Sequence, residues 1–214
     1  MIGDKLVVTD YHRNAAKQIR EFLADRLGKQ PLAVSVAGES GCGKSETAQC
    51  LADLAAEQGL TWFILGQDDY FKLPPKTNHR RRQEDLTWVG PSEVELDLMD
   101  HHVAALKTGQ TKQVEKPLVY FEEDRIGSEQ IPGGPYDLVI TEGTYTTLLQ
   151  NVDVRAFIDR NYRQTKKARL TRGRDPDVLF LEQVLAIEHD IISKHKALSD
   201  VVIAAPADEQ APSA

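Results

Sequence analysis

Residues 38–45 form the stretch Gly-Glu-Ser-Gly-Cys-Gly-Lys-Ser, and this stretch decides the fold. It satisfies the pattern G-x-x-x-x-G-K-[ST] of a phosphate-binding loop. The apolar run 32–37 before it is typical of a buried strand, and the segment 44–58 after it carries apolar residues at helical spacing. Because the motif stands between a strand and a helix, a chance match in a glycine-rich loop is the weaker interpretation.

The residues of this loop are the ones expected to hold a nucleotide. Its glycines let backbone N–H groups converge on phosphate oxygens, and the next helix adds the positive end of its dipole. Lys44 is expected to reach the β- and γ-phosphates, and Ser45 to bind Mg²⁺. Cys42 is expected to be a small residue that fits a tight loop, with an activated thiol as the alternative. The expected nucleotide-binding set is Gly38, Glu39, Ser40, Gly41, Cys42, Gly43, Lys44, Ser45 and Glu46.

The composition is typical of an intracellular enzyme. The chain has 214 residues and a formal net charge of −7, which argues against a protein that coats nucleic acid. No apolar run is long enough to span a bilayer, and residues 1–4 do not begin a signal peptide. The two cysteines, Cys42 and Cys50, give no disulfide framework. We therefore expect a cytoplasmic protein whose partner is a small molecule rather than nucleic acid or membrane, with homo-oligomerisation left open.

Strand and helix patterns alternate along the chain, with a polar, basic and proline-containing segment at 72–91 that predicts a long functional loop. Ser92 is expected to cap the helix that follows this loop. Helices are expected at 10–29, 44–58, 92–108 and 176–198, strands at 32–37, 61–65, 137–141, 156–158 and 201–203, and an outlying strand or hairpin arm at 114–120.

This alternation predicts an α/β fold of the phosphate-loop NTPase type. We expect a mostly parallel sheet of about five strands with helices on both faces and a small lid. Residues 1–205 are expected to form one domain, with the lid at about 165–175 and a substrate loop and hairpin at about 72–125. Residues 206–214 are expected to be a disordered tail.

Acidic residues follow two of the expected strands. Because ligands bind at the carboxyl ends of parallel strands, we expect Asp68, Asp69 and Glu142 to meet the phosphate loop. Asp68 is expected to accept the proton of an acceptor hydroxyl or to bind metal through water, and Asp69 is the alternative. Capping of a turn remains open for both. Glu142 is expected to hold a Mg²⁺-bound water with Ser45 and Asp68, or to form a buried structural pair.

Two basic runs stand outside this set. Residues 166–175 carry five cations and are expected to form a lid in which Arg169, Arg172 and Arg174 stabilise a transferring phosphoryl group. A solvated basic face is the alternative. The run 79–82, His-Arg-Arg-Arg, either contacts an anionic substrate or pairs with acidic residues 84 and 85.

The motifs, taken in order, make the chain resemble the uridine kinase and phosphoribulokinase family over about residues 31–203. The likeness lies in 38–45 (G-x-S-G-S-G-K-[ST]), 67–71 (Q-D-S-F-Y), 117–121 (P-x-Y-D-[FY]), 142–143 (E-G), 169–175 (R-R-x-x-R-D) and 198–203 (Y-A-D-V-I-I). The resemblance implies ATP and Mg²⁺ as cofactors, Asp68 as the catalytic base, Glu142 as a residue that helps hold Mg²⁺, and a hairpin that contacts the substrate.

The family's N-F-D-H-P segment, whose Asp holds ribose hydroxyls, corresponds here to residues 87–91, with Val89 at the Asp position. We therefore expect a kinase that transfers the γ-phosphate of ATP to a nucleoside or sugar-like acceptor, and we expect uridine to be a poor substrate. A non-catalytic ATP-sensing module and a phosphotransferase acting on a protein or nucleotide sugar are the alternatives. The expected acceptor-side set is Asp69, Tyr70, Arg82, Trp88, Tyr120, Phe121 and Tyr145.

Overall fold

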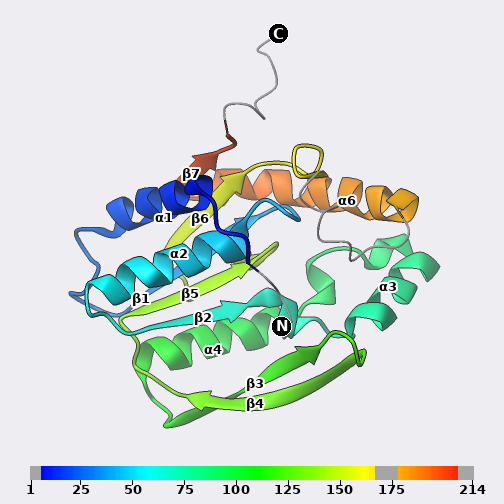
Figure 1. Ribbon diagram of the computed structural model, residues 1–214. Helices are drawn as coiled ribbons and strands as arrows, with labels where there is room; N and C mark the ends of the chain where they lie inside the picture. The colour runs from blue at the N-terminus through cyan, green and yellow to red at the C-terminus, as the bar shows by residue number, and fades with distance from the viewer. Residues whose placement is uncertain (1–5, 167–177, 207–214) are drawn as a thin grey trace.

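A five-stranded parallel sheet forms the centre of the chain, whose computed structural model describes residues 6–166 and 178–206 (Figure 1). Its strand order is β2-β5-β1-β6-β7, and every neighbouring pair is parallel. The strands are β1 (Leu32–Gly38), β2 (Trp62–Gly66), β5 (Leu138–Gly143), β6 (Val154–Asp159) and β7 (Val201–Ala204). The predicted fold class is confirmed, while residues 167–175 of the predicted lid and 207–214 of the predicted tail lie outside the described residues.

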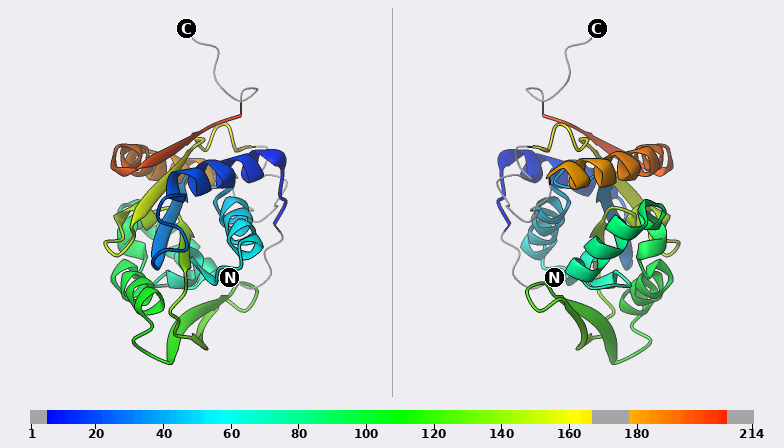
Figure 2. Two further views of the ribbon diagram at one scale, coloured as in Figure 1. Left: turned by 90° about the vertical axis from the view of Figure 1, so that its left-hand side faces the viewer. Right: turned by 90° about the vertical axis from the view of Figure 1, so that its right-hand side faces the viewer.

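Helices cover both faces of this sheet (Figure 2). On one face, α1 (Asp10–Leu23) and α2 (Lys44–Glu57) pack on residues such as Val34 and Val36 of β1. On the other, α4 (Leu96–Thr108) and the end of α6 (Val178–Ile192) pack with Ala33 and Ala37. Every residue of β1 is buried, which explains its continuous apolar sequence.

A two-stranded antiparallel hairpin lies beside the main sheet, formed by β3 (Gln113–Tyr120) and β4 (Arg125–Pro132). This confirms the hairpin arm expected at 114–120. Short 3-10 turns occupy Gln67–Tyr70, Leu86–Trp88, Pro91–Glu93, Thr146–Leu148 and Ser193–Leu198. No helix among the described residues is long and apolar enough to cross a membrane.

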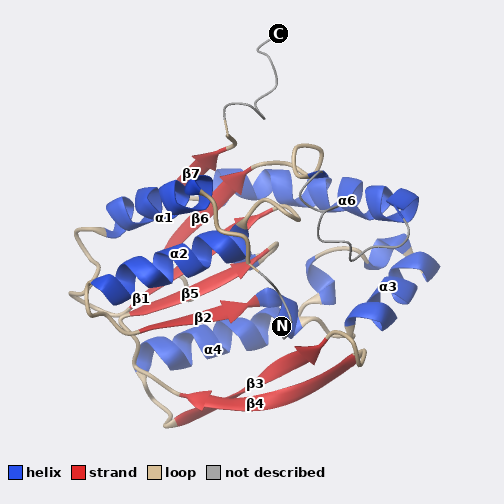
Figure 3. Cartoon of the chain, in the orientation of Figure 1, coloured by secondary structure: helices blue, strands red, loops and turns tan. Residues whose placement is uncertain are grey.

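The prediction of a long loop at 72–91 is wrong, because most residues of this segment are helical. Helix α3 (Pro75–Glu84) lies beyond the carboxyl ends of the main strands (Figure 3). Its only buried side chain is that of Asn78, so its sequence carries no apolar stripe from which a helix could be predicted. The hairpin tip caps it, since the Asp124 carboxylate accepts hydrogen bonds from the backbone N–H groups of Lys76 and Thr77 at 2.7 and 3.1 Å.

Three helix boundaries also differ from expectation. The first helix ends at Leu23, and the last changes to a 3-10 turn after Ile192. The middle helix begins at Leu96 rather than 92, and Ser92 does not cap it. Residues 91–93 instead form a turn in which the buried Glu93 carboxylate accepts from the Gly90 N–H at 2.8 Å.

Candidate functional site

The phosphate loop and the acidic strand ends meet at one edge of the sheet. In the strand register, Glu142 of β5 lies between Val36 of β1 and Gly66 of β2. Ser45, in the first turn of α2, donates a hydrogen bond from its Oγ to Glu142 Oε2 at 3.2 Å. The predicted meeting of these strand ends is therefore present.

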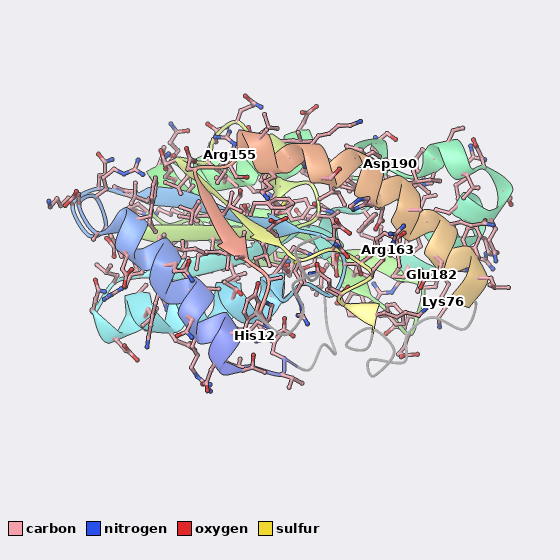
Figure 4. All side chains as sticks on the ribbon, turned by 90° about the horizontal axis from the view of Figure 1, so that it is seen from above. His12, Lys76, Arg155, Arg163, Glu182 and Asp190 are labelled. Atoms are coloured by element: carbon pink, nitrogen blue, oxygen red, sulfur yellow. The ribbon has the colours of Figure 1, made fainter. Side chains whose placement is uncertain are left out.

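The loop backbone is packed so closely that two of its glycines have no room for a side chain. A Cβ on Gly38 would lie 2.7 Å from Cys42 Sγ and 2.8 Å from the Ile158 carbonyl oxygen. A Cβ on Gly43, whose φ is 100°, would lie 2.5 Å from Nε2 of His12 on α1. Figure 4 shows His12 at the N-terminal end of α1. Only glycine therefore fits at these two positions of the loop.

The side chains of Lys44, Glu39 and Cys42 in the loop differ in their burial and in their contacts. Lys44 is half-buried, and its Nζ donates to the Glu39 carbonyl oxygen at 2.9 Å. The Glu39 carboxylate accepts from the Tyr162 N–H at 2.7 Å and lies 2.7 Å from His189 Nδ1 on α6. Burial raises the pKa of the Cys42 thiol, so a buried packing residue is favoured over an activated thiol.

The carboxylates at the edge have the chemistry of a magnesium site. Burial, with a further contribution from the Asp68 charge, raises the pKa of Glu142 to about 7. No cluster of three or more His, Cys, Asp or Glu suited to a metal occurs among the described residues. Mg²⁺, however, commonly takes only one or two protein carboxylates and completes its shell with water and phosphate oxygens. Ser45, Asp68 and Glu142 therefore fit Mg²⁺ bound together with a nucleotide.

The two neighbouring acids after β2 have different surroundings. Asp69 is buried, and its carboxylate contacts Lys116 Nζ at 3.0 Å and accepts from the Val119 N–H at 3.0 Å. Lys116 also contacts Glu129 at 2.8 Å. Asp69 thus fastens the hairpin to the end of β2. Asp68, in contrast, is exposed.

The aromatic residues expected on the acceptor side separate into buried and accessible groups. Tyr70 is 1% exposed, with its hydroxyl 2.8 Å from His102 Nδ1, so it is a core residue. Tyr120 is partly exposed and lies under the Arg125 guanidinium at 3.9 Å from the ring centroid. Phe121 is half-buried near the hairpin tip, and Trp88 donates from Nε1 to Asn78 Oδ1 at 2.8 Å.

Two arginines of the basic run 79–82 form ion pairs of different kinds. Arg81 pairs with Glu84 at 3.7 Å and Asp85 at 3.6 Å, as one of the alternatives expected. Arg82 does not. It donates to both oxygens of Glu93, at 2.6 and 3.0 Å, and to Glu188 of α6 at 3.2 Å.

The ion pairs of Glu93 and Glu188 with Arg82 were not predicted from the sequence. A signal for Glu188 was available, because it shares the buried face of α6 with Val184 and Ile192, four residues away on either side. A carboxylate on an apolar face implies a buried partner.

Val89 is 5% exposed and has no polar group, so it cannot replace the family's Asp. Arg169, Arg172 and Arg174 lie outside the described residues.

The chain is similar to known proteins over most of its length. The profile of the Phosphoribulokinase / Uridine kinase family matches residues 33–175. A uridine kinase of Bacillus cereus (strain AH187) is 28% identical over 188 residues, covering 81% of this chain and 85% of the relative. The structure titled a possible uridine kinase from Bacillus stearothermophilus has a TM-score of 0.64 at 17% identity, covering 89% of this chain and 98% of that one. Phosphoribulokinase from Rhodobacter spheroides has a TM-score of 0.62 at 12% identity, covering 82% and 70%.

Proposed function

Because the chain belongs to the phosphoribulokinase / uridine kinase family, we propose that its strand-end site transfers the γ-phosphate of ATP to a hydroxyl of a nucleoside or sugar-like metabolite. The chain is a phosphate-loop kinase, and kinases of this family use ATP and typically Mg²⁺. One observation carries the proposal. The loop with Lys44, the Ser45–Glu142 pair and the Asp68 carboxylate share one edge of the sheet.

On the phosphate side, the backbone N–H groups of residues 38–46 bind the phosphate oxygens, and Lys44 neutralises charge on the β- and γ-phosphates. Ser45 and Glu142 would hold Mg²⁺, and Asp68 would reach the ion through a water molecule. When bound, the ion withdraws electron density from the phosphate oxygens. Arg169, Arg172 and Arg174 are assigned to the transferring phosphoryl group on the family resemblance, in a lid at about 165–175 of a single domain, 1–205.

On the acceptor side, Asp68 accepts the proton of the attacking hydroxyl. The new bond joins the acceptor oxygen to the γ-phosphorus, the bond from γ-phosphorus to the bridging oxygen breaks, and ADP leaves. The support for Asp68 over Asp69 is that the Asp69 carboxylate is already engaged by Lys116 and the Val119 N–H. Trp88, Tyr120 and Phe121 offer aromatic faces to a ring.

The test is a coupled ADP-release screen with MgATP across nucleosides, neutral sugars, sugar phosphates and hydroxy acids. We expect acceptor-dependent ADP release from the wild type and its loss in Lys44→Ala. An ATP-sensing module would bind ATP without acceptor-dependent release, and a protein phosphotransferase would label a polypeptide instead. Either result, or equal turnover by Lys44→Ala, contradicts the proposal.

A further inference from the structure

The side chain of Glu39 joins the phosphate loop to two other parts of the chain. Its carboxylate is buried, with 7% of the side chain exposed. One oxygen, Oε2, accepts a hydrogen bond from the Tyr162 N–H at 2.7 Å. The other, Oε1, lies 2.7 Å from Nδ1 of His189 on α6. Both carboxylate oxygens are therefore engaged by groups from outside the loop.

The first anchor of Glu39 is the turn that follows β6. Asn161 caps this turn, because its Oδ1 accepts from the Arg163 N–H at 3.0 Å and from the next N–H at 3.2 Å. The Tyr162 N–H stands at the start of the turn, where N–H groups lack partners within it, and the Glu39 carboxylate supplies one. Thr165 Oγ1 of the same turn donates to the carbonyl oxygen of loop residue 40 at 2.8 Å. The turn therefore holds two consecutive residues of the phosphate loop.

The second anchor, His189, stands on a helix that is packed firmly against the rest of the fold. The end of α6 buries Ile192 completely, and Glu188, the residue before His189, forms an ion pair with Arg82 at 3.2 Å. An ionised carboxylate only accepts hydrogen bonds, so Nδ1 of His189 carries the hydrogen in its contact with Glu39. The helix therefore offers the loop a donor whose position is set by the core.

The phosphate loop benefits from such anchors because its own backbone has little to restrain it. Gly38, Gly41 and Gly43 have φ angles of 151°, 76° and 100°, and glycine loses more conformational freedom on ordering than any other residue. A loop that is already ordered does not bear this cost when a ligand binds. The phosphate-loop pattern leaves residue 39 unspecified, as does the family's version of it, so the Glu39 anchor is a feature of this chain.

We propose that Glu39 is a positioning residue for the nucleotide, and that its contacts with the Tyr162 N–H and His189 hold the phosphate loop in the shape that binds a triphosphate. The carboxylate acts through the loop backbone, including the Glu39 carbonyl oxygen that accepts from Lys44 Nζ at 2.9 Å. This role rests on the phosphate side of the proposed function. A purely electrostatic role would have the opposite sign, because a carboxylate on the loop repels a triphosphate.

The experiment measures the Kd of the magnesium complex of adenylyl imidodiphosphate, a non-hydrolysable ATP analogue, by titration calorimetry. We expect the Kd to rise about tenfold in Glu39→Ala, because the loop then becomes ordered only on binding. Glu39→Gln should stay within about twofold of wild type, since its amide oxygen still accepts from the Tyr162 N–H and its NH₂ group can donate to Nδ1 of His189 in the other tautomer.

Variants of His189 test the second anchor at a position where 39% of the side chain is exposed. His189→Ala should raise the Kd about threefold, the effect of one lost hydrogen bond, and His189→Asn should restore it because Nδ2 replaces the lost donor. Asp190→Asn is the matched control, since Asp190 is exposed on the same helix (Figure 4). Its Kd should equal that of wild type.

Three results would overturn the positioning role while leaving the kinase function intact. One is a Kd in Glu39→Ala equal to or below that of wild type, and another is an equal rise in Glu39→Gln, which would show that the charge matters and not the contacts. The third is an acceptor KM that rises as much as the KM for ATP, which indicates general loss of structure. Titrations are made well below each variant's melting temperature, and the His189 pair carries the test if Glu39→Ala does not fold. Binding of the analogue needs no acceptor, so a wild type that binds it and phosphorylates nothing contradicts the kinase function alone.

Discussion

The phosphate side and the acceptor side of the site are built in opposite ways. The phosphate side is made of consecutive residues, 38–46, whose backbone is shaped by glycines. The acceptor side is made of side-chain pairs far apart in the chain, such as Asp69 with Lys116 and Arg82 with Glu188. A triphosphate can be bound by local backbone geometry, whereas recognition of a particular acceptor needs side chains that only tertiary structure brings together.

The two sides also differ in what a substitution is expected to damage. The phosphate side has a partly exposed charge in Lys44, so its loss should affect turnover more than stability. The acceptor side has buried ion pairs, and removal of one partner leaves a buried charge uncompensated.

Lys44→Ala is expected to have the largest effect. It should lower kcat/KM by about 10³-fold or more, which is several kcal/mol of transition-state stabilisation, because it removes the cation that we propose contacts the γ-phosphate. The melting temperature should stay unchanged, since within the described part of the chain Lys44 Nζ donates only to the Glu39 carbonyl oxygen. Lys17→Ala, an exposed position on α1, is the control. Wild-type turnover by Lys44→Ala would remove the phosphate side from the account.

Asp68→Asn and Asp69→Asn should separate turnover from stability within two adjacent residues. Asp68→Asn should lower kcat by about 10²–10⁴ with little change in melting temperature, as expected for a general base. Asp69→Asn should instead cost roughly 3 kcal/mol of stability, because it weakens a buried pair. Kinetics and denaturant unfolding of both variants test this. If Asp69→Asn stays stable and loses more kcat than Asp68→Asn, then Asp69 and not Asp68 is the general base.

Arg82→Ala and Arg81→Ala compare a buried with an exposed ion pair. Arg82→Ala should destabilise the protein by about 3 kcal/mol, since Glu93 and Glu188 both lose their cation. Arg81→Ala should change stability by less than about 1 kcal/mol, because its pairs with Glu84 and Asp85 are exposed. Urea unfolding of the two variants gives the comparison, and equal destabilisation would contradict it.

Glu142→Gln should stabilise the ligand-free protein in a pH-dependent way. The Glu142 pKa is about 7 in the folded state against an ordinary 4.5, so the folded state binds the proton more tightly. Wild-type stability therefore falls as pH rises from about 4.5 to 7, whereas Gln has no charge to bury. The variant's advantage should be near zero at pH 4.5 and on the order of 1–3 kcal/mol above pH 7.

Thermal melts in EDTA at pH 4.5 and pH 8 measure this effect, with the exposed Glu57→Gln on α2 as the control. With MgATP bound, the wild type should be more stable than Glu142→Gln, because its carboxylate then gains a cation. An advantage that does not change with pH would show that Glu142 is already ionised at low pH in the folded protein.

The core of the fold and the phosphate loop could be predicted from the sequence, because local signals determine them. The run 32–37 is apolar because β1 is buried on both faces, and residues 38–45 carry their glycines in a fixed order. The order of the strand ends then implied that Glu142 would lie near Ser45, and the two are hydrogen-bonded.

The acceptor side could not be predicted to the same degree. Helix α3 has a polar sequence and is capped by Asp124 from the hairpin, so residues 75–84 lack the apolar periodicity from which a helix is usually predicted. Asp69 was the alternative to Asp68 as the base, and no sequence pattern indicated that Lys116 of the hairpin would be its partner. The alternatives for Arg82 considered only neighbours in sequence, whereas its partners Glu93 and Glu188 come from a separate turn and from α6.

The most direct test of the central claim is to follow the γ-phosphate of ATP by ³¹P NMR in a reaction containing the wild type, Mg²⁺ and a neutral polyol from the screen. The account predicts that the γ-phosphate resonance is replaced by a phosphomonoester of the polyol, with an equal amount of ADP, and that Asp68→Asn slows this conversion about 10²–10⁴-fold. ADP accompanied only by inorganic phosphate, or a phosphorylated polyol formed equally fast by Asp68→Asn, would contradict it.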